Sequence, residues 1–316
     1  MHRFFAIIIA AAMIFSVSAC ASNRAETADF FAMDTFMSIT AYGRSAKDAV
    51  SEAELNITSL SCEMNVADPN SRLSQFNAGK DVFLSKDMES ILPTAQHVAK
   101  LTDGAFDVNI YPVVAAWGFL SGDYRVPEPE ELSELLADKR LYDFGGIAKG
   151  YASDIAAEIM RERDVSSALI ALGGNIYAIG NTPDGKPWRV AVQDPEDLSG
   201  YAGILSLTDE AAVTSGGYQR FFEQDGVTYH HIIDPRSGYP AESGLISVTV
   251  VSKNGTLADG LSTGLFVLGY DRALEIWGDN RELFDLVLIE DSGSITITAG
   301  LDGRFESEYG FDVAGT

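Results

Sequence analysis

A run of short β-strands occupies the middle of this chain and limits its fold more than any other feature. The strand-like segments are residues 168–172, 176–179, 188–192, 203–207 and 245–251. Between the last two, Asp225-Gly226 is a two-residue hairpin signal that joins residues 218–224 to residues 227–233. Strands joined by short turns pair antiparallel, because parallel strands need long crossover connections. This part of the chain therefore predicts a mainly antiparallel sheet.

Helical patterns lie on both sides of these strands. Alternating apolar residues predict a strand at residues 30–42 and a closing hairpin of residues 284–290 and 294–298. Apolar periodicity and capping residues predict helices in four segments. They cover residues 46–64, a segment that begins after the N-cap Ser85, a segment that begins near Thr256, and residues 271–277. Residues 128–134 read as an acidic linker. Few strand-helix-strand units occur, so we predict an α+β fold, with a mainly antiparallel or mixed β-sheet core flanked by helices.

The N-terminus has the pattern of a secretory signal. A charged start is followed by an apolar run over residues 4–17, which is short for a membrane span, and by small residues before Cys20. Val17-Ser-Ala-Cys20 fits the lipobox that precedes a lipid-modified cysteine. We therefore expect a lipoprotein signal peptide at residues 1–19, a tether at 20–28 and one domain at 29–316, anchored by lipid to a membrane of the cell envelope on its extracytoplasmic side. An ordinary signal peptide or an uncut anchor is the alternative.

The chain is strongly acidic, with 22 Lys and Arg against 46 Asp and Glu and a formal charge of -24. This charge argues against nucleic acid as a partner and against binding to anionic lipid by charge. On so acidic a chain, a phosphate ligand would need local positive charge, which a divalent cation and helix N-termini can supply. Solubility alone is the other interpretation of the charge. With Cys20 lipidated, only Cys62 remains, so we expect no intramolecular disulfide.

Asp259 and Thr263 lie four residues apart in a segment with helical spacing, so both side chains fall on one helix face. A carboxylate and a hydroxyl so placed suit two oxygen ligands of a hard cation. Thr256 and Asp259 also fit the Ser/Thr-x-x-acid pattern of a capping box, in which Asp259 would only cap the helix. The spacing alone leaves both interpretations open.

The segment from Asp143 to Gly150 reads Asp-Phe-Gly-Gly-Ile-Ala-Lys-Gly and opens a helix. A glycine-rich helix entry binds anions through its free N–H groups, and Lys149 would add a positive charge. The glycine spacing does not match a dinucleotide-binding fingerprint. A tight turn without a ligand is the alternative, and Leu172-Gly-Gly-Asn175 likewise reads as a hairpin turn.

Two adjacent histidines, His230 and His231, lie on the second strand of the predicted hairpin. Adjacent strand residues face opposite sides, so only one of them can face a site, and the pattern does not tell which. Asp234 and Arg236 follow in a turn. A carboxylate, a guanidinium and an imidazole together suit a phosphoryl site with a general base.

These segments together resemble the ApbE-type FAD:protein FMN transferases. The matching motifs occur in the family's order between about residues 31 and 270: Met33-Asp-Thr35-Phe, Pro69-Asn-Ser71-Arg-Leu-Ser-Gln-Phe-Asn77, Gly104-Ala-Phe-Asp107, the segment from Asp143 to Ala152, Leu172-Gly-Gly-Asn175, Thr214-Ser-Gly216, His231 to Gly238, and Leu257-Ala-Asp259 with Thr263. The lipoprotein start is also common in that family. One departure lies at Ala67 or its neighbours, in the loop before Pro69-Asn-Ser71, where many members have an aromatic residue.

The resemblance implies Mg2+-dependent cleavage of the FAD pyrophosphate, transfer of FMN through its phosphate to a threonine of an acceptor protein, and release of AMP. The implied acceptors are flavoprotein subunits of membrane electron-transport complexes with a Ser/Thr-Gly-Ala-Ser/Thr-like motif. By position, the resemblance implies cation ligands at the Gly146 carbonyl, Asp259, Ser262 and Thr263, FAD contacts at Met33, Ala105, Phe106, Asp107, Asp143, Lys149 and Ile233, and catalytic roles for His231 and Asp259. An FAD pyrophosphatase that yields FMN and AMP, and a non-catalytic FAD-binding lipoprotein, remain as alternatives.

Overall fold

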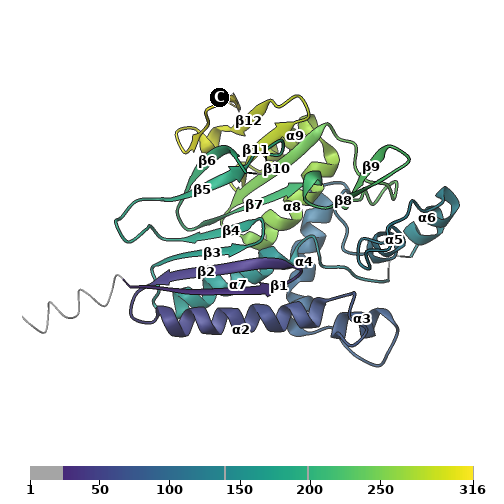
Figure 1. Cartoon of the computed structure of the whole chain (residues 1–316), viewed down its shortest axis with the longest axis horizontal. Helices are drawn as coiled ribbons and strands as arrows, with labels where there is room; N and C mark the ends of the chain where they lie inside the picture. Colours follow the sequence, from purple (N-terminus) through teal and green to yellow (C-terminus); the bar gives the residue numbers. More distant parts are fainter. Residues whose placement is uncertain (1–23, 139, 198, 316) are drawn as a thin grey trace, which may run out of the picture.

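The structure is a computed structural model that describes residues 24–138, 140–197 and 199–315 (Figure 1). The predicted signal peptide and the lipidation site at Cys20 lie outside these residues. Within them, the largest element is a nine-stranded sheet with the spatial order β1 (Ala25–Ala32), β2 (Thr35–Tyr42), β3 (Ser167–Leu172), β4 (Asn175–Ile179), β7 (Glu210–Gly216), β10 (Leu245–Ser252), β11 (Asp285–Glu290), β12 (Ile295–Thr298) and β14 (Asp312–Ala314). Neighbouring strands pair antiparallel, apart from the parallel pair β12–β14. The α+β prediction is confirmed.

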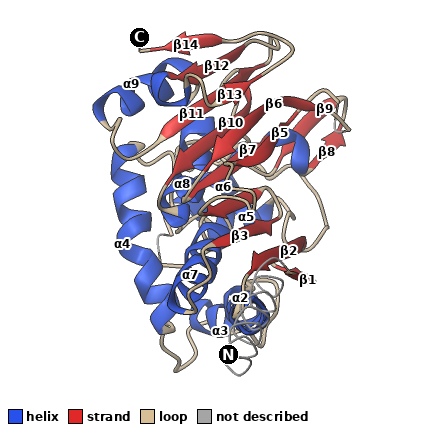
Figure 2. Cartoon of the chain, turned by 90° about the vertical axis from the view of Figure 1, so that its left-hand side faces the viewer, coloured by secondary structure: helices blue, strands red, loops and turns tan. Residues whose placement is uncertain are grey.

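Helices cover one face of this sheet (Figure 2). The covering helices are α2 (Ala46–Met64), α7 (Ala148–Glu162), α8 (Gly255–Leu268) and α9 (Tyr270–Asp279), with α4 (Lys86–Leu101) packed against α8. Their apolar faces and the inward side chains of the strands form the largest buried cluster, which includes Met37, Ile57 and Leu265. Burial of this apolar surface is the main contribution to the stability of the fold.

A second, three-stranded sheet covers part of the opposite face. It consists of β5 (Trp188–Gln193), β6 (Tyr201–Leu207) and β13 (Phe305–Glu306). Its buried residues, such as Leu205 and Phe305, form a cluster with Ala212, Val287 and Ile297 of the large sheet. No helix among the described residues has the length and hydrophobicity needed to cross a bilayer.

A small lobe lies beside the sheet, at the end where the turn between β1 and β2 is found. It contains α5 (Tyr111–Ala116), α6 (Pro129–Leu136) and the hairpin of β8 (Phe221–Gln224) and β9 (Val227–His230), while α3 (Arg72–Asn77) follows α2. Trp117 is fully buried in this lobe, and its indole N–H donates to the Gly238 carbonyl at 2.7 Å. The aromatic residues of this lobe, such as Trp117 and Phe119, therefore serve mainly to form its buried core.

Several predicted boundaries were wrong. Residues 30–42 form parts of two strands, because Met33 and Asp34 adopt positive φ angles of 48° and 58° and turn the chain back on itself. Strand β1 begins at Ala25, so the predicted tether does not extend to residue 28. The predicted acidic linker contains α6, which begins at Pro129 and buries Leu132. The first strand of the predicted hairpin starts only at Phe221, since Gly217–Gln219 form a 3-10 turn.

Helices α7 and α8 pack closely at Gly150. A Cβ atom at this position would lie 2.2 Å from the Gly255 carbonyl oxygen and 2.6 Å from the Asp259 Cβ. Both distances are far shorter than van der Waals contact, so the two helices can approach this closely only with glycine here. The last glycine of the Asp143–Gly150 segment thus has a packing role.

We expect Gly150→Ala to lower the free energy of unfolding by about 1–3 kcal/mol, because the methyl group must push α7 and α8 apart. Urea denaturation measures this change. Gly278→Ala in α9 is the matched control, since a Cβ atom there meets nothing within 4 Å. That control should keep or slightly raise stability, because alanine favours helix over glycine. Equal stability of Gly150→Ala and the wild type would contradict the packing role.

Candidate active site

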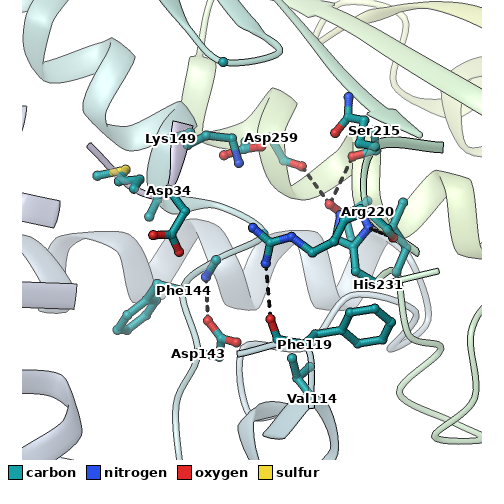
Figure 3. A pocket seen from close by; sticks show the side chains of 18 of the residues that line it. Asp34, Val114, Phe119, Asp143, Phe144, Lys149, Ser215, Arg220, His231 and Asp259 are labelled. Atoms are coloured by element: carbon teal, nitrogen blue, oxygen red, sulfur yellow. Dashed lines mark hydrogen bonds between the residues drawn. The ribbon is translucent and has the colours of Figure 1, made fainter. Parts of the chain in front are cut away.

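A cavity of about 800 Å3 opens at the end of the large sheet (Figure 3). Its walls come from the β1–β2 turn, the β3–β4 turn, the end of β7, the N-terminus of α7 and the second turn of α8. The lining residues predicted from sequence are Met33, Ala105, Phe106, Asp107, Asp143, Gly146, Lys149, His231, Ile233, Asp259 and Thr263. Segments more than 200 residues apart in sequence, such as Met33 and Asp259, therefore meet in one place.

Asp259 is not a helix cap. The N-cap of α8 is Asn254, whose side chain accepts from the Leu257 N–H at 2.7 Å. Asp154 of α7 accepts the N–H groups of Gly255 and Thr256 at 2.7 and 2.8 Å. The capping interpretation was therefore wrong, because two other residues already satisfy the first N–H groups of the helix.

The Asp259 side chain instead lies at the wall of the cavity. The residue is 3% exposed, and one carboxylate oxygen, Oδ2, accepts from the Gly150 N–H at 2.7 Å. Among the described residues, no ion pair joins Asp259 to a lysine, arginine or histidine. A buried carboxylate is costly unless it is paired or binds a cation, so this position favours a cation ligand.

Three hydroxyl groups lie together beside the backbone carbonyl of Asp259. Ser215 Oγ lies 2.8 Å from Ser262 Oγ and 3.3 Å from Thr263 Oγ1, and the Ser262 hydroxyl donates to the Asp259 carbonyl at 2.9 Å. Gly146 is close by, since a Cβ atom there would lie 3.6 Å from Thr263 Oγ1. Carboxylate, carbonyl and hydroxyl oxygens are the donors that Mg2+ prefers. The residues present therefore fit the implied cation.

Ser262 differs from the other predicted ligands. It is fully buried and does not line the cavity, and its hydroxyl is engaged by Ser215 and by the Asp259 carbonyl. The structure thus places Ser262 beneath the site, where it orients the neighbouring hydroxyls. In the described part of the chain, no three His, Cys, Asp or Glu side chains gather in a metal-binding arrangement.

The hydrogen bonds distinguish the two histidines. The ring of His230 is satisfied on both sides: Nε2 donates to the Ala241 carbonyl at 2.9 Å, and Nδ1 accepts from the Ile232 N–H at 3.2 Å. His231 lines the cavity, and its Nδ1 donates to the Arg220 carbonyl at 3.1 Å. A ring that donates through Nδ1 keeps a lone pair on Nε2 when neutral. His231 is therefore the histidine able to accept a proton in the site.

Burial, followed by the positive charge of Arg220, lowers the pKa of His231 to about 4. We expect an NMR titration of this imidazole to have its midpoint near pH 4, with His231→Gln used to assign the signal. In the unfolded chain the pKa of this histidine is near 6.5. Between pH 6.5 and pH 4 the unfolded chain therefore binds a proton at His231 that the native state does not bind. The free energy of unfolding consequently falls as the pH drops from 6.5 towards 4. A midpoint near 6.5 would mean that neither burial nor the charge of Arg220 lowers the pKa of His231.

Positive groups also line this cavity, although the chain is acidic overall. Lys149 and Arg220 point into the cavity, and the N-terminus of α7 lies beside them (Figure 3). Burial raises the pKa of Asp143, while the Gly145 N–H and the charges of Arg220 and Lys149 oppose this rise. A helix N-terminus with two cationic side chains is suited to bind phosphate groups.

Arg236 does not take part in this cluster. Its guanidinium pairs with the Asp234 carboxylate in the turn after β9, with Nη2 and Oδ2 2.8 Å apart, and neither residue lines the cavity. The predicted contribution of these two side chains to a phosphoryl site was therefore wrong. The Arg236 guanidinium is held by this local ion pair, and Arg220, which directly precedes β8, supplies the positive charge in the cavity instead.

Two asparagines hold the Asp143 segment in place. The Asn77 side chain donates to the Tyr142 carbonyl at 2.8 Å and accepts the Tyr142 N–H at 3.0 Å. Asn109 donates to the Leu141 carbonyl at 3.3 Å. The segment that ends at Asn77 thus positions Asp143 from outside the cavity.

The sequence analysis gave no site role to several residues that line the cavity or contact its residues, among them Gly150, Asn175, Ser215 and Arg220. Asn175 follows a two-glycine turn, lines the cavity and is 1% exposed, and its Nδ2 has no hydrogen-bond partner among the described residues. The hairpin turn predicted at Gly173-Gly174 is confirmed. Gly150, Asn175 and Ser215 lie inside motifs that were recognised, whereas no pattern in the sequence points to Arg220.

The sequence profile of the ApbE family matches residues 33–287 of this chain. The FAD:protein FMN transferase of Haemophilus influenzae is 32% identical over 277 residues, which cover 78% of this chain and 80% of the relative. The enzyme of the same name from Vibrio cholerae is 32% identical over 273 residues, covering 78% and 81%.

Solved structures agree with these sequence matches. The crystal structure of the ApbE protein of Thermotoga maritima superimposes with a TM-score of 0.80 at 30% identity, covering 89% of this chain and 99% of that chain. The flavin transferase ApbE of Vibrio cholerae superimposes with a TM-score of 0.77 at 28% identity, covering 89% and 100%. The chain therefore belongs to the ApbE family.

Proposed function

We propose that this protein transfers the FMN moiety of FAD to a threonine hydroxyl of an acceptor protein and releases AMP. The observation that supports this most strongly is that the free Nε2 of His231 and the buried carboxylate of Asp259 face one cavity. The names of the relatives, FAD:protein FMN transferase, point to the same reaction.

The cavity has separate regions for the parts of FAD. Met33 and Phe106 offer apolar surface that suits a flavin or adenine ring. Lys149, Arg220 and the N-terminus of α7 suit the pyrophosphate, since two cationic side chains and the positive end of the helix dipole attract its negative charge. Ala105, Asp107, Asp143 and Ile233 complete the proposed FAD contacts.

The proposed cation is Mg2+. Asp259, Thr263 and the Gly146 carbonyl would hold it, and Ser215 and Ser262 would orient these ligands. When bound, Mg2+ supplies positive charge that offsets the charge developing on the cleaved pyrophosphate.

In the transfer step, the threonine oxygen attacks the phosphorus of the FMN half of FAD. The bond from this phosphorus to the bridging oxygen breaks, and AMP leaves with that oxygen. His231 Nε2 accepts the threonine proton, and the Arg220 carbonyl keeps the ring oriented through Nδ1–H. A pKa lowered to about 4 keeps His231 neutral at neutral pH, so its Nε2 lone pair is not protonated before the threonine binds.

We also propose that Cys20 is lipidated, which would hold the domain on the extracytoplasmic side of a membrane of the cell envelope. Flavoprotein subunits of membrane electron-transport complexes would then be within reach as acceptors. The lipobox sequence at residues 17–20 supports this placement. Cys20→Ser should release the protein from the membrane fraction and prevent incorporation of radiolabelled palmitate. Unchanged labelling of that variant would refute lipidation at Cys20.

One assay separates the proposed transfer from its alternatives. The mature protein is incubated with FAD, Mg2+ and a soluble acceptor domain that bears a Ser/Thr-Gly-Ala-Ser/Thr-like motif, and the products are separated on a denaturing gel and by chromatography. Fluorescence that remains on the acceptor supports transfer. Free FMN and AMP without labelled acceptor indicate a pyrophosphatase, and intact bound FAD indicates a binding protein.

A further inference from the structure

The outer face of the β1–β2 hairpin contains an anomaly. Directly opposed residues of two antiparallel strands share one face of the sheet. The inner pairs, such as Phe30 with Met37, belong to or pack against the main core, together with α2. On the outer face, Thr27 pairs with Thr40 and Asp29 with Ser38, as expected for a surface in water. The last outer pair, next to the turn, is Phe31 with Phe36, and we name it the Phe pair.

The Phe pair is unusually exposed for two aromatic residues directly opposed across a hairpin. Phe31 is 70% exposed and Phe36 is 62% exposed. The three-stranded sheet that covers the outer face elsewhere reaches Tyr42, Leu169 and Ile176 but leaves this end open. Two adjacent exposed aromatic rings are a feature of interaction sites, since such rings contribute strongly to binding when they become buried.

The position of the Phe pair indicates what binds there. Phe31 lines the mouth of the active-site cavity, whereas Phe36 does not. An acceptor protein that brings a hydroxyl into this cavity must contact the residues around its opening. Phe31 is one of these residues, so the acceptor would pass next to the Phe pair. Strand β1 is also an edge strand of the large sheet, and an edge offers free backbone groups to an extended segment.

We propose that the Phe pair is the docking surface for the acceptor protein, which binds through an extended segment with an apolar side chain next to the modified threonine. This inference rests on the proposed transfer function. The two phenylalanine rings contact the apolar side chain of the acceptor at the edge of the cavity. The threonine next to that side chain then enters the cavity towards His231. Selection of acceptors thus depends on Phe36, which lies outside the cavity proposed to bind FAD, together with Phe31 at the edge of that cavity.

A membrane fits this surface less well. The Phe pair lies at the turn end of the hairpin, roughly 20 Å from Ala25 at about 3.4 Å per residue, so it is far from the end of β1 that a lipid anchor at Cys20 would hold. The nearest charged side chains on the hairpin, Asp29 and Asp34, are acidic and would repel anionic lipid. Both points favour a protein over a lipid surface.

The test uses the mature protein without lipid and the acceptor domain of the transfer assay. We expect Phe36→Ser to weaken acceptor binding and to raise the acceptor KM by about tenfold or more, as for a central aromatic contact. The Kd for FAD and the rate at saturating acceptor should stay unchanged, because Phe36 does not line the cavity. Phe36→Tyr should retain most of the binding. Phe83→Ser is the matched control, since Phe83 is 80% exposed and does not line the cavity, and it should leave acceptor binding unchanged.

The outcomes separate this inference from the proposed function. If the wild type binds the acceptor domain and Phe36→Ser binds it equally well, or if the wild type does not bind it, the docking role is refuted. A loss of FAD affinity in Phe36→Ser would also refute it, because the residue would then act through the FAD site. Sedimentation with phosphatidylglycerol vesicles that depends on Phe36, with unchanged acceptor KM, would assign the pair to a membrane instead. Weaker acceptor binding in Phe36→Ser, but no transfer by the wild type, would uphold docking and refute the transfer function.

Discussion

Replacing Asp259 with asparagine is expected to lower FAD turnover by about a thousandfold or more, because the proposed Mg2+ would lose its charged ligand and with it most of the electrostatic stabilisation of the reacting phosphate groups. The fold should remain, since asparagine can still accept the Gly150 N–H through its oxygen. Removal of a buried charge without an ion-pair partner should leave the free energy of unfolding unchanged or raise it. Turnover kinetics and urea denaturation measure the two effects.

The control for Asp259 is Asp154, a half-buried carboxylate at the contact of α7 and α8. It caps α8 through Gly255 and Thr256 and does not line the cavity. Asp154→Asn should therefore cost about 0.5–2 kcal/mol of stability and keep the Mg2+-dependent activity. Mg2+ should raise the Tm of the wild type and of Asp154→Asn but not that of Asp259→Asn. Full activity in Asp259→Asn would contradict its assignment as a cation ligand.

Replacing His231 with alanine is expected to slow transfer by about a hundredfold to ten-thousandfold, the usual range for loss of a general base. FAD should still bind, because Lys149, Arg220 and the N-terminus of α7 remain in place. Single-turnover kinetics measure the transfer rate, and quenching of flavin fluorescence measures the Kd for FAD.

The neighbouring histidine provides the comparison. His230→Gln should mainly lower stability, since His230 is held between the Ala241 carbonyl and the Ile232 N–H and its ring packs on Phe266. The transfer rate of His230→Gln should stay well above that of His231→Ala. Unimpaired transfer in His231→Ala would remove the proton-accepting role.

The elements that were predicted well are those with strong local signals. The Asp225-Gly226 hairpin and the helix from Ala46 to Met64 follow from turn chemistry and apolar spacing, which act over a few residues. Strand β7 was missed although it lies in the centre of the sheet. Its consecutive buried residues Ala211, Ala212 and Val213 do not alternate with polar ones, so the period of two is absent.

The site depended on contacts that local patterns do not contain. The choice between a cap and a ligand for Asp259 was decided by Asp154 and Gly150, which lie more than 100 residues earlier in the chain. The choice between His230 and His231 was decided by hydrogen bonds to Ala241 and Arg220. The order of the motifs in the sequence indicated which residues belong to the site. Which side chains point into the cavity became clear only from the packing of segments that are distant in sequence.

The central claim is that the cavity couples FAD cleavage to formation of a bond with a protein hydroxyl. The most direct measurement is the ratio of AMP released to FMN bound covalently to the acceptor domain, with the modified residue located by mass spectrometry. We expect one AMP for each FMN, attached to the motif threonine, and no AMP release when that threonine is replaced by valine. Release of AMP together with free FMN at the same rate with either acceptor would contradict the claim.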